Sequence, residues 1–222
     1  MARHAYELTK SHRLCLAGGV ALNCVSNGRT LREGPFKEIF VQPAAGDAGG
    51  AYGAASFISH ALFREPRVSR WETAFTGPTF DEEEARKVLD REGAVYEEFR
   101  NGELLETVAR KIAEGRVVGW VQDRMEFGPR ALGHRSILAD PRDPKMKDVV
   151  NLKIKFRETF RPFAPTVLEE ECPNYFQLSQ ESPFMLLVAP VREDKRVIPS
   201  VTHVDGSARI QTINRNQDQL FL

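Results

Sequence analysis

The sequence has few cysteines, no excess charge and no long apolar run, and each absence excludes a class of protein. Three cysteines, Cys15, Cys24 and Cys172, fit neither a disulfide framework nor a CxxC zinc pair. No window approaches the ~20 consecutive apolar residues of a membrane-spanning helix, and the N-terminus MARHAYELTKSHR lacks the apolar core of a signal peptide. Lys+Arg and Asp+Glu both number 31, which gives no case for a nucleic-acid or membrane-surface protein. We expect a reduced, cytoplasmic protein.

The remaining composition is that of a globular chain with an uneven distribution of charge. Its 222 residues, 41% hydrophobic and 28% charged, can bury the core of one large or two small domains. Residues 81–106 hold ten acids against four bases, which a solvated helical face explains. Residues 116–161 hold eleven bases against six acids, and this arginine-rich stretch suits an anionic ligand.

The first 75 residues show one pattern twice: a short apolar run, a glycine-rich turn and a helix. The apolar runs are short enough for strands and end at Gly or Pro. The pattern predicts strands at 13–17 and 38–42, turns at 18–19 and 44–50, and helices at 20–31 and 51–63. Such repeats indicate an α/β layer whose loops lie on one edge.

Residues 64–79 contain Pro and Gly without apolar periodicity, which predicts a domain linker before a second unit. Asp81 and Glu84 then form a capping-box pattern. We predict helices at 81–93 and 103–114, and strands at 96–99, 116–121, 185–189 and 208–213. No turn or capping signal precedes the last residues, Leu220 to Leu222, so we expect the fold to be interrupted there. The sequence also starts inside a possible helix, and we expect an interruption at that end as well.

Two segments of the second unit combine cations with fixed turns. In residues 127–136, Gly128 and a proline fix a turn that lets main-chain N–H groups approach a ligand, and Arg130 and Arg135 offer bidentate donors for phosphate or carboxylate oxygens. A surface turn with solvated arginines is the simpler explanation of this segment alone. Residues 153–165 interleave cations with apolar residues, and on a strand Lys153, Lys155 and Arg157 would share a face. Together the two segments favour a phosphate pocket, although a solvated face or an RNA surface also fits such interleaving.

Smaller signals accompany them. Gly18 and Gly19 head a predicted helix, where free N–H groups favour anions. Arg209 follows a tight Asp-Gly turn and could reach the same pocket, whereas His203 is more simply a structural hydrogen-bonding residue. Asp47 is either a turn residue or a hard oxygen ligand, and the chain offers neither a cysteine nor an HxxH pair to complete a metal site.

Five stretches in their order along the chain resemble the ATP-dependent O-carbamoyltransferases, which include nodulation-factor and antibiotic carbamoyltransferases. The GPRALG and FRPFAP segments are highly specific to that family. The stretches are LAGGVALN (16–23), PAAGDAGGAYGAA (43–55), MEFGPRALGHRSILADPR (125–142), KFRETFRPFAP (155–165) and HVDGSARIQT (203–212).

The resemblance implies an α/β fold in two parts, truncated at both ends. Residues 1–75 would be the last part of an actin-like (ASKHA) domain, and residues 80–222 an incomplete YrdC-like twisted-sheet domain. The YrdC-like domain would join carbamoyl phosphate and ATP into carbamoyl-adenylate, releasing phosphate and pyrophosphate. The actin-like domain would move the carbamoyl group to a substrate hydroxyl, and the cofactors implied are ATP with Mg²⁺, and Fe²⁺.

The resemblance also implies roles for individual residues. The cations that would hold carbamoyl phosphate, the adenylate and the leaving phosphates, and carry catalysis, are Arg130, Lys155, Arg161 and Arg209. The residues implied to line the nucleotide and carbamoyl phosphate sites are Gly18, Gly19, Asn23, Gly128, Arg135, Ser136 and His203. Asp47 would be one metal ligand.

Two family features are missing from these 222 residues. The HxxH metal motif would lie before residue 1, and an Asn-Thr-Ser-Phe-Asn segment would follow Leu222. We therefore expect an incomplete iron site and a chain that by itself does not complete the transfer reaction. A carbamoylated product made by the isolated chain would contradict this.

Two other function classes are weaker. An RNA-binding module is disfavoured by the zero net charge and by the joined GPRALG and FRPFAP segments. A kinase of actin-like fold, suggested by the first unit, leaves the whole second unit unexplained. The acceptor hydroxyl and the oligomeric state stay open, with a homo-oligomer one outcome because a truncated half exposes apolar surface.

Overall fold

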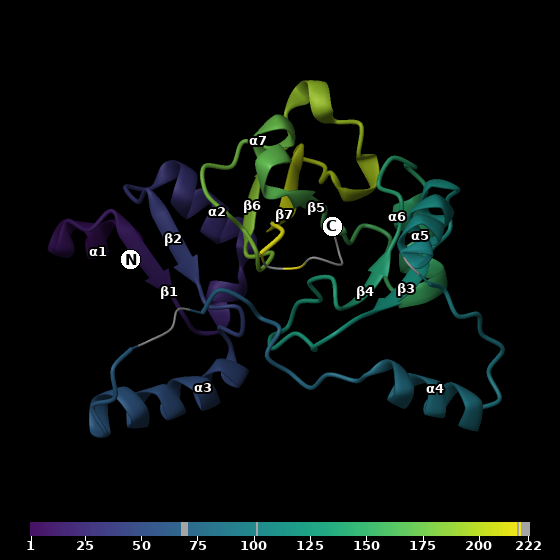
Figure 1. The fold of residues 1–222 in the computed structure, drawn as a ribbon. Coiled ribbons are helices and arrows are strands. Elements are labelled where there is room, and N and C mark those ends of the chain that lie inside the picture. Colours follow the sequence, from purple (N-terminus) through teal and green to yellow (C-terminus); the bar gives the residue numbers. More distant parts are fainter. Residues whose placement is uncertain (68–70, 101, 217, 219–222) are drawn as a thin grey trace.

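The computed structural model describes residues 1–67, 71–100, 102–216 and 218 as a mixed α/β chain with three small sheets (Figure 1). The last residues, Leu220 to Leu222, lie outside the described part. The α-helices are α1 (Ala2–Thr9), α2 (Cys24–Glu33), α3 (Asp47–Phe57), α4 (Glu82–Arg91), α5 (Glu103–Ala113), α6 (Met146–Val150) and α7 (Cys172–Tyr175). The strands are β1 (Arg13–Leu16), β2 (Glu38–Val41), β3 (Val118–Val121), β4 (Arg135–Leu138), β5 (Thr166–Leu168), β6 (Leu187–Pro190) and β7 (Ser207–Ile213).

The first unit has the predicted strand–turn–helix order. β1 and β2 pair in parallel, with Leu14 opposite Ile39, so both glycine-rich turns follow the carboxyl ends of neighbouring strands. The first predicted helix differs in detail, because a short 3₁₀ helix (Gly19–Leu22) precedes α2. Asn23 interrupts the two helices and caps α2, its side chain accepting the Ser26 N–H. The second helix starts earlier than predicted, at Asp47, and continues as a π-helical turn, Ile58–Leu62.

The second unit contains an antiparallel pair, β3–β4, and a three-stranded sheet in the order β5–β7–β6. β7 lies in the middle of that sheet, parallel to β5 and antiparallel to β6. Its side chains are almost all buried, as expected of a central strand. α5 and the Asp81–Glu84 capping box of α4 confirm the predictions made for them.

One predicted strand, 96–99, is wrong. This segment lies along α4 instead, because the Tyr96 hydroxyl donates to Asp90 and the Glu98 carboxylate pairs with Arg86 at 2.8 Å. The strand considered for 153–157 is also absent, since Asn151–Lys155 forms a π-helical turn. Within the described residues neither segment pairs with a neighbouring strand, and a strand needs such a partner.

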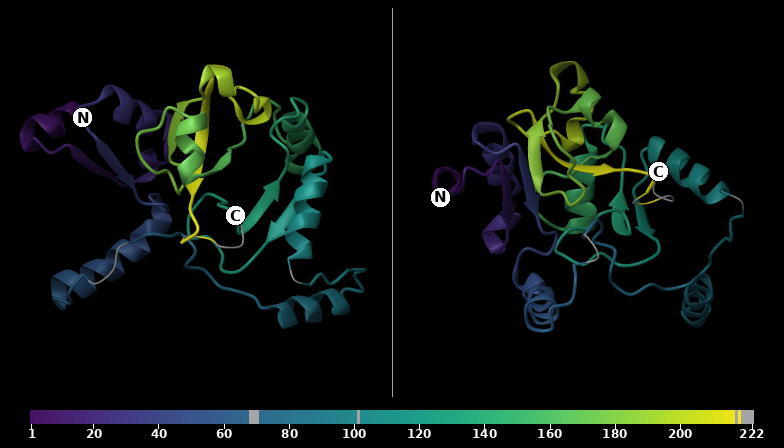
Figure 2. Two further views of the ribbon diagram at one scale, coloured as in Figure 1. Left: turned by 45° about the horizontal axis from the view of Figure 1, so that its top comes forward. Right: turned by 60° about the vertical axis from the view of Figure 1, so that its left-hand side comes forward.

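The two units share one core. α2 packs on β6, and Figures 1 and 2 show the two elements side by side. The contact is close because Gly28 brings the helix against the strand: a Cβ there would lie 2.1 Å from the Val188 carbonyl oxygen. The buried Asn27 amide donates to the carbonyls of Ala21 (2.7 Å) and Leu186 (3.1 Å), which fixes the helix to both units.

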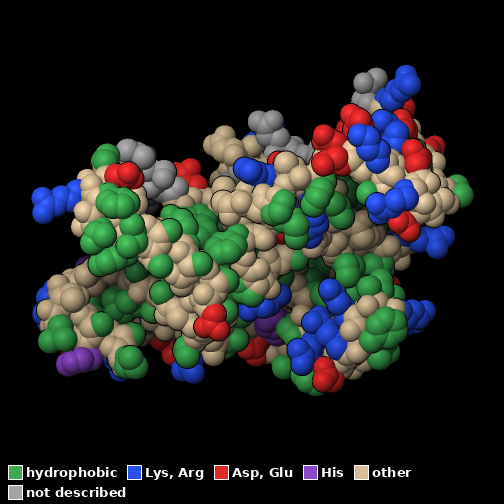
Figure 3. Space-filling model, turned by 90° about the horizontal axis from the view of Figure 1, so that it is seen from below, with side chains coloured by type: hydrophobic (Ala, Val, Ile, Leu, Met, Phe, Trp, Pro, Cys, Tyr) green, Lys and Arg blue, Asp and Glu red, His purple; other side chains and the backbone are tan. Residues whose placement is uncertain are grey.

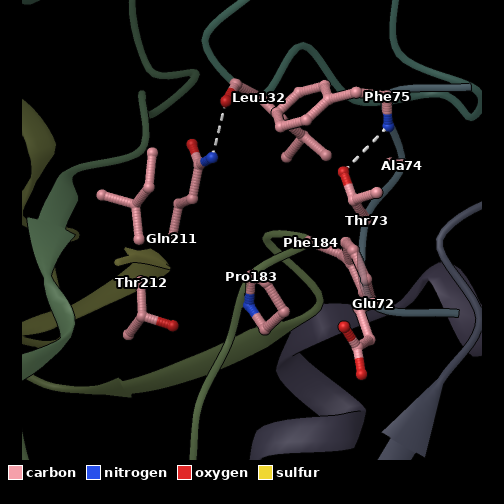
Figure 4. A pocket seen from close by; sticks show the side chains of 10 residues that line it. Glu72, Thr73, Ala74, Phe75, Leu132, Pro183, Phe184, Gln211 and Thr212 are labelled. Atoms are coloured by element: carbon pink, nitrogen blue, oxygen red, sulfur yellow. Dashed lines mark hydrogen bonds between the residues drawn. The ribbon is translucent and has the colours of Figure 1, made fainter. Parts of the chain in front are cut away.

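The junction between the units is packed rather than loose. The described residues of 64–79 form no helix or strand, as a linker predicts, but Ala74 is only 2% exposed and belongs to the shared core. The Phe75 ring stacks on His134 with centroids 3.5 Å apart. Figure 4 shows this segment beside Leu132 and β7, where the Gln211 amide donates to the Leu132 carbonyl at 2.6 Å. The linker therefore holds the units in place.

The lower surface of the molecule is divided by polarity (Figure 3). α3 and its π-helical turn expose large apolar side chains, among them Tyr52, Phe57 and Leu62, whereas α4 is covered by charged residues. Even so, among the described residues no helix has both the length and the hydropathy to cross a membrane.

The cysteines differ in exposure, which gives a chemical prediction. Cys15 is exposed, whereas Cys172 is buried, and burial raises the pKa of the Cys172 thiol to about 11, with the Glu169 charge adding to the effect. Because the thiolate is the reactive form, a thiol reagent at pH 8 is expected to label Cys15 rapidly and Cys172 only after unfolding. Peptide mapping after a timed alkylation measures this, and equal labelling of the two in the folded chain would contradict it.

Candidate functional site

The two glycine-rich turns meet at the carboxyl edge of β1 and β2. Gly18, with φ of 96°, donates its N–H to the Ala45 carbonyl at 2.7 Å. No atom outside the neighbouring residues lies within 4 Å of a Cβ built on Gly18 or Gly19, so this turn leaves open space. Asp47 is exposed in the first turn of α3. Such an edge is where ligands bind in α/β folds.

The loop of the GPRALG segment lies against this edge. A Cβ on Gly128, whose φ is 139°, would be 2.8 Å from the Pro43 carbonyl oxygen, so glycine permits the close approach. Arg130 reaches the first unit, donating to the Leu22 carbonyl at 3.4 Å. The structure thus brings Gly128 and Arg130 to the turns around Gly18, as one site requires.

Glu126 organises the loop, and sequence reasoning did not identify it. Its carboxylate accepts the N–H groups of Leu132 (2.7 Å), His134 (3.0 Å) and Arg135 (3.2 Å). Burial raises the pKa of Glu126, but these N–H groups outweigh burial and hold the pKa below its usual value. The only signal in the sequence was a carboxylate at the start of a glycine-rich turn.

His134 anchors the same loop from the other side. Its ring contacts the Arg124 carbonyl (2.6 Å) and the Asp218 carboxylate (2.9 Å), which also accepts the Gln122 amide at 2.7 Å. Arg135, predicted to line the nucleotide or carbamoyl phosphate site, donates to backbone carbonyls, among them Asp123 at 3.1 Å. The Ser136 hydroxyl accepts the Gly133 N–H at 3.0 Å. These partners make Arg135 and Ser136 part of the loop's framework.

The centre of the site is a pair of arginines, Arg130 and Arg209, which we call the arginine pair. Burial lowers the pKa of Arg209, the nearby charges of Arg130 and Arg157 lower it further, and Cys24 at the start of α2 acts in the opposite direction. The Nε atoms of Arg130 and Arg209 are buried without a hydrogen-bond partner in the described part of the chain. Arginine nevertheless stays charged at neutral pH. The two guanidinium groups therefore repel each other, and no ion-pair partner neutralises either of them among the residues that the structure describes.

A bound anion would satisfy this arrangement. Within the described ranges, neither Arg130 nor Arg209 has a carboxylate within the 4.0 Å limit of an ion pair. The start of α2 at Cys24 adds the positive end of a helix dipole. Planar arginine donors match phosphate and carboxylate oxygens in geometry and charge. This arrangement of positive charge can accept the oxygens of an anion such as a phosphate group.

The remaining predicted residues are placed as follows. His203 has a buried Nε2 without a partner in the described chain, and its pKa is lowered by burial and by the Arg209 charge, against the effect of Asp205. Lys155 is exposed. Arg161 is exposed too and pairs with Glu158 at 2.9 Å. The charge of Arg209 thus acts on His203, whereas Lys155 and Arg161 lie at the surface.

A metal site does not follow from these residues. Among the residues described, no three His, Cys, Asp or Glu side chains form a group that could hold an ion. Asp47 thus belongs to no such group in the described part of the chain.

Comparison with known proteins gives two family matches. A model described as Carbamoyltransferase N-terminus matches residues 2–56, and one described as Carbamoyltransferase C-terminus matches residues 109–222. The chain is 50% identical to nodulation protein NolNO of Sinorhizobium fredii, over 99% of this chain and 33% of that protein. It is 46% identical to nodulation protein NolO of Bradyrhizobium diazoefficiens, over 99% of this chain and 41% of that protein.

An uncharacterised Synechocystis protein is also 50% identical, over 94% of this chain and 38% of that protein. The chain thus spans between a third and about two fifths of the length of these relatives. The N-terminal match covers the two glycine-rich turns, and the C-terminal match covers the arginine pair and the loop that Glu126 holds. The residues of the site therefore come from both matched regions.

Proposed function

The chain belongs to the carbamoyltransferase family, and from this premise we propose that it is part of an ATP-dependent O-carbamoyltransferase. In the proposed reaction, carbamoyl phosphate, ATP and one water give carbamoyl-adenylate, phosphate and pyrophosphate. The carbamoyl group then passes to a hydroxyl of a small-molecule acceptor, and AMP leaves. The substrates of the proposed first step, carbamoyl phosphate and ATP, are both polyanions.

The arginine pair is the observation that supports this proposal. Two partly buried guanidinium groups that pair with no described carboxylate can hold phosphate oxygens while charge moves between the transferred group and the leaving phosphate. Because the pair is fixed before substrate arrives, little reorganisation is needed as that charge develops. His203, kept neutral beside Arg209, can offer a hydrogen bond without adding to the repulsion.

Two finer assignments belong to the same proposal. Residues 1–75 would be the end of an actin-like domain, with Gly18, Gly19 and Asn23 at the adenylate. Residues 80–222 would be the YrdC-like domain that forms it, with Lys155 and Arg161 approaching the substrates when these bind. The parallel β1–β2 pair and the packing of α2 on β6, which bring the turns of one unit to the arginines of the other, support these assignments.

Calorimetric titration of the chain with carbamoyl phosphate and with ATP tests the proposal. We expect the unmodified chain to bind both, and Arg130→Ala to bind at least ~10-fold more weakly, because a hydrogen bond to a charged group contributes about 1.5–3 kcal/mol. Arg116→Ala, which removes an exposed charge outside the site, is the control and should bind normally. If the folded unmodified chain binds neither ligand, the proposed function is wrong.

A further inference from the structure

Arg157 stands apart from the other cations of its segment. It is partly buried, whereas Lys153, Lys155 and Arg161 are exposed. Its Nε donates to the Oδ1 of Asn151 at 2.8 Å, and its guanidinium carbon lies 5.1 Å from the centre of the Phe163 ring. One edge and one face of the guanidinium are therefore held, while the terminal nitrogens make no hydrogen bond in the described part of the chain.

Asn151 is built to hold this side chain. It is fully buried, at 0% exposure, and its amide nitrogen donates to the carbonyls of Thr159 (3.3 Å) and Arg161 (3.0 Å). These bonds close the loop that follows Arg157 and leave the Asn151 oxygen directed to the arginine. A buried amide with every polar atom bonded fixes orientation well, because any other rotamer would break several bonds.

The pairing of β5 with β7 relates the segment after Arg157 to the strand that carries Arg209. β5 and β7 are parallel, with Thr166 opposite Gln211, and the Gln211 N–H donates to the Pro165 carbonyl at 3.0 Å. The segment that enters β5, including Phe163, therefore runs beside the part of β7 that carries Arg209. Phe163 also packs against the buried cluster to which Ala208 and Ile210 of β7 belong. The Arg157 charge accordingly lowers the pKa of Arg209.

We infer that Arg157 is a further anion-binding residue of this site, its free terminal nitrogens contacting phosphate oxygens of carbamoyl phosphate or of ATP. The inference rests on the proposed function. Three arginines that approach one another without an ion-paired carboxylate are stable together only at the expense of repulsion, which an anion removes. Glu158 is the nearest acid in the sequence. The Arg157 charge helps to lower the pKa of Glu158, but the Glu158 carboxylate forms its ion pair with Arg161. Arg157 thus has no ion-pair partner in the described part of the chain.

The substitution Arg157→Gln tests the charge while keeping the local structure. The Nε2 of glutamine is as many bonds from the backbone as the Nε of arginine, so the hydrogen bond to Asn151 can persist while the charge and terminal nitrogens are lost. We expect carbamoyl phosphate or ATP to bind about 10-fold or more weakly, with a shallower dependence of affinity on salt. Arg116→Gln is the matched control, and the unfolding temperature should be similar in both variants.

The titrations separate the two ligands and the two proposals. A loss for carbamoyl phosphate alone assigns Arg157 to that substrate, and a loss for ATP alone assigns it to the nucleotide phosphates. If the unmodified chain binds and Arg130→Ala weakens binding, but Arg157→Gln matches Arg116→Gln for both ligands, this inference is overturned and the proposed function stands. If the folded unmodified chain binds neither ligand, both are overturned.

Discussion

Replacing Arg209 with methionine is expected to weaken carbamoyl phosphate binding by about 10- to 100-fold, because at least one hydrogen bond to a charged group is lost. The same change is expected to raise the thermal stability of the ligand-free chain. Burial and the charges of Arg130 and Arg157 all oppose the guanidinium of Arg209, and a long apolar side chain removes that repulsion. Weaker binding together with higher stability is expected of a site whose like charges repel one another until an anion binds.

Calorimetry for binding and thermal unfolding without and with carbamoyl phosphate measure the two effects together. The unmodified chain should be stabilised by the ligand, and Arg209→Met should start higher and gain less. Arg192→Met, at an exposed arginine 3.8 Å from Asp194, is the control and should change neither quantity greatly. Normal affinity in the Arg209 variant would show that the arginine pair is not the anion site.

Replacing Gly28 with alanine is expected to lower the free energy of unfolding by about 2–3 kcal/mol, the usual cost of forcing extra volume into a packed site. In a helix this substitution ordinarily stabilises, by up to about 1 kcal/mol. Here the new Cβ would meet the Val188 carbonyl oxygen at 2.1 Å, so α2 must move away from β6. The Asn27 bonds to Ala21 and Leu186 would be strained at the same time.

Gly53→Ala in α3 is the matched control, because no atom beyond its own helix turn lies within 4 Å of the Cβ it would add. It should stabilise the chain by about 0.5–1 kcal/mol, opposite in sign to Gly28→Ala. Denaturant unfolding of both variants provides the comparison. Since α2 begins at the arginine pair, Gly28→Ala should also reduce affinity for carbamoyl phosphate. Equal stability changes in the two variants would show that the α2–β6 contact is not needed.

Local features were predictable where the sequence pattern has one physical solution. Strands next to glycine-rich turns, the Asp81–Glu84 capping box and α5 were predicted, because short apolar runs, caps and helical periodicity depend on neighbouring residues. The segment 96–99 was not, because its residues fit a strand but find their partners on α4. The strand considered at 153–157 was wrong for another reason, because Asn151–Lys155 continues α6 as a π-helical turn.

The candidate site divides in the same way. The chemistry of the residues alone predicted Arg130 and Arg209 among the anion-binding groups. Specific motifs indicated the carbamoyltransferase family, and the family matches confirmed it. Only the tertiary structure distinguished Arg157, held by Asn151 and Phe163, from Arg161, which pairs with Glu158 at the surface. It also showed that Arg135 donates hydrogen bonds to backbone carbonyls of its own loop, and that Glu126 accepts the backbone N–H groups that shape this loop.

The sequence by itself determined the chemical class of this protein: a neutral α/β chain with arginine-rich, glycine-containing segments suited to an anion, in a recognisable family order. The tertiary structure decided which arginines meet, which are neutralised, and that the two units share one core through α2 and β6. The physical reason is the distance along the sequence over which each kind of interaction acts. Propensity, capping and periodicity act within a few residues, whereas burial, repulsion and ion pairing depend on contacts between residues up to about 160 positions apart, such as Asn27 and Leu186.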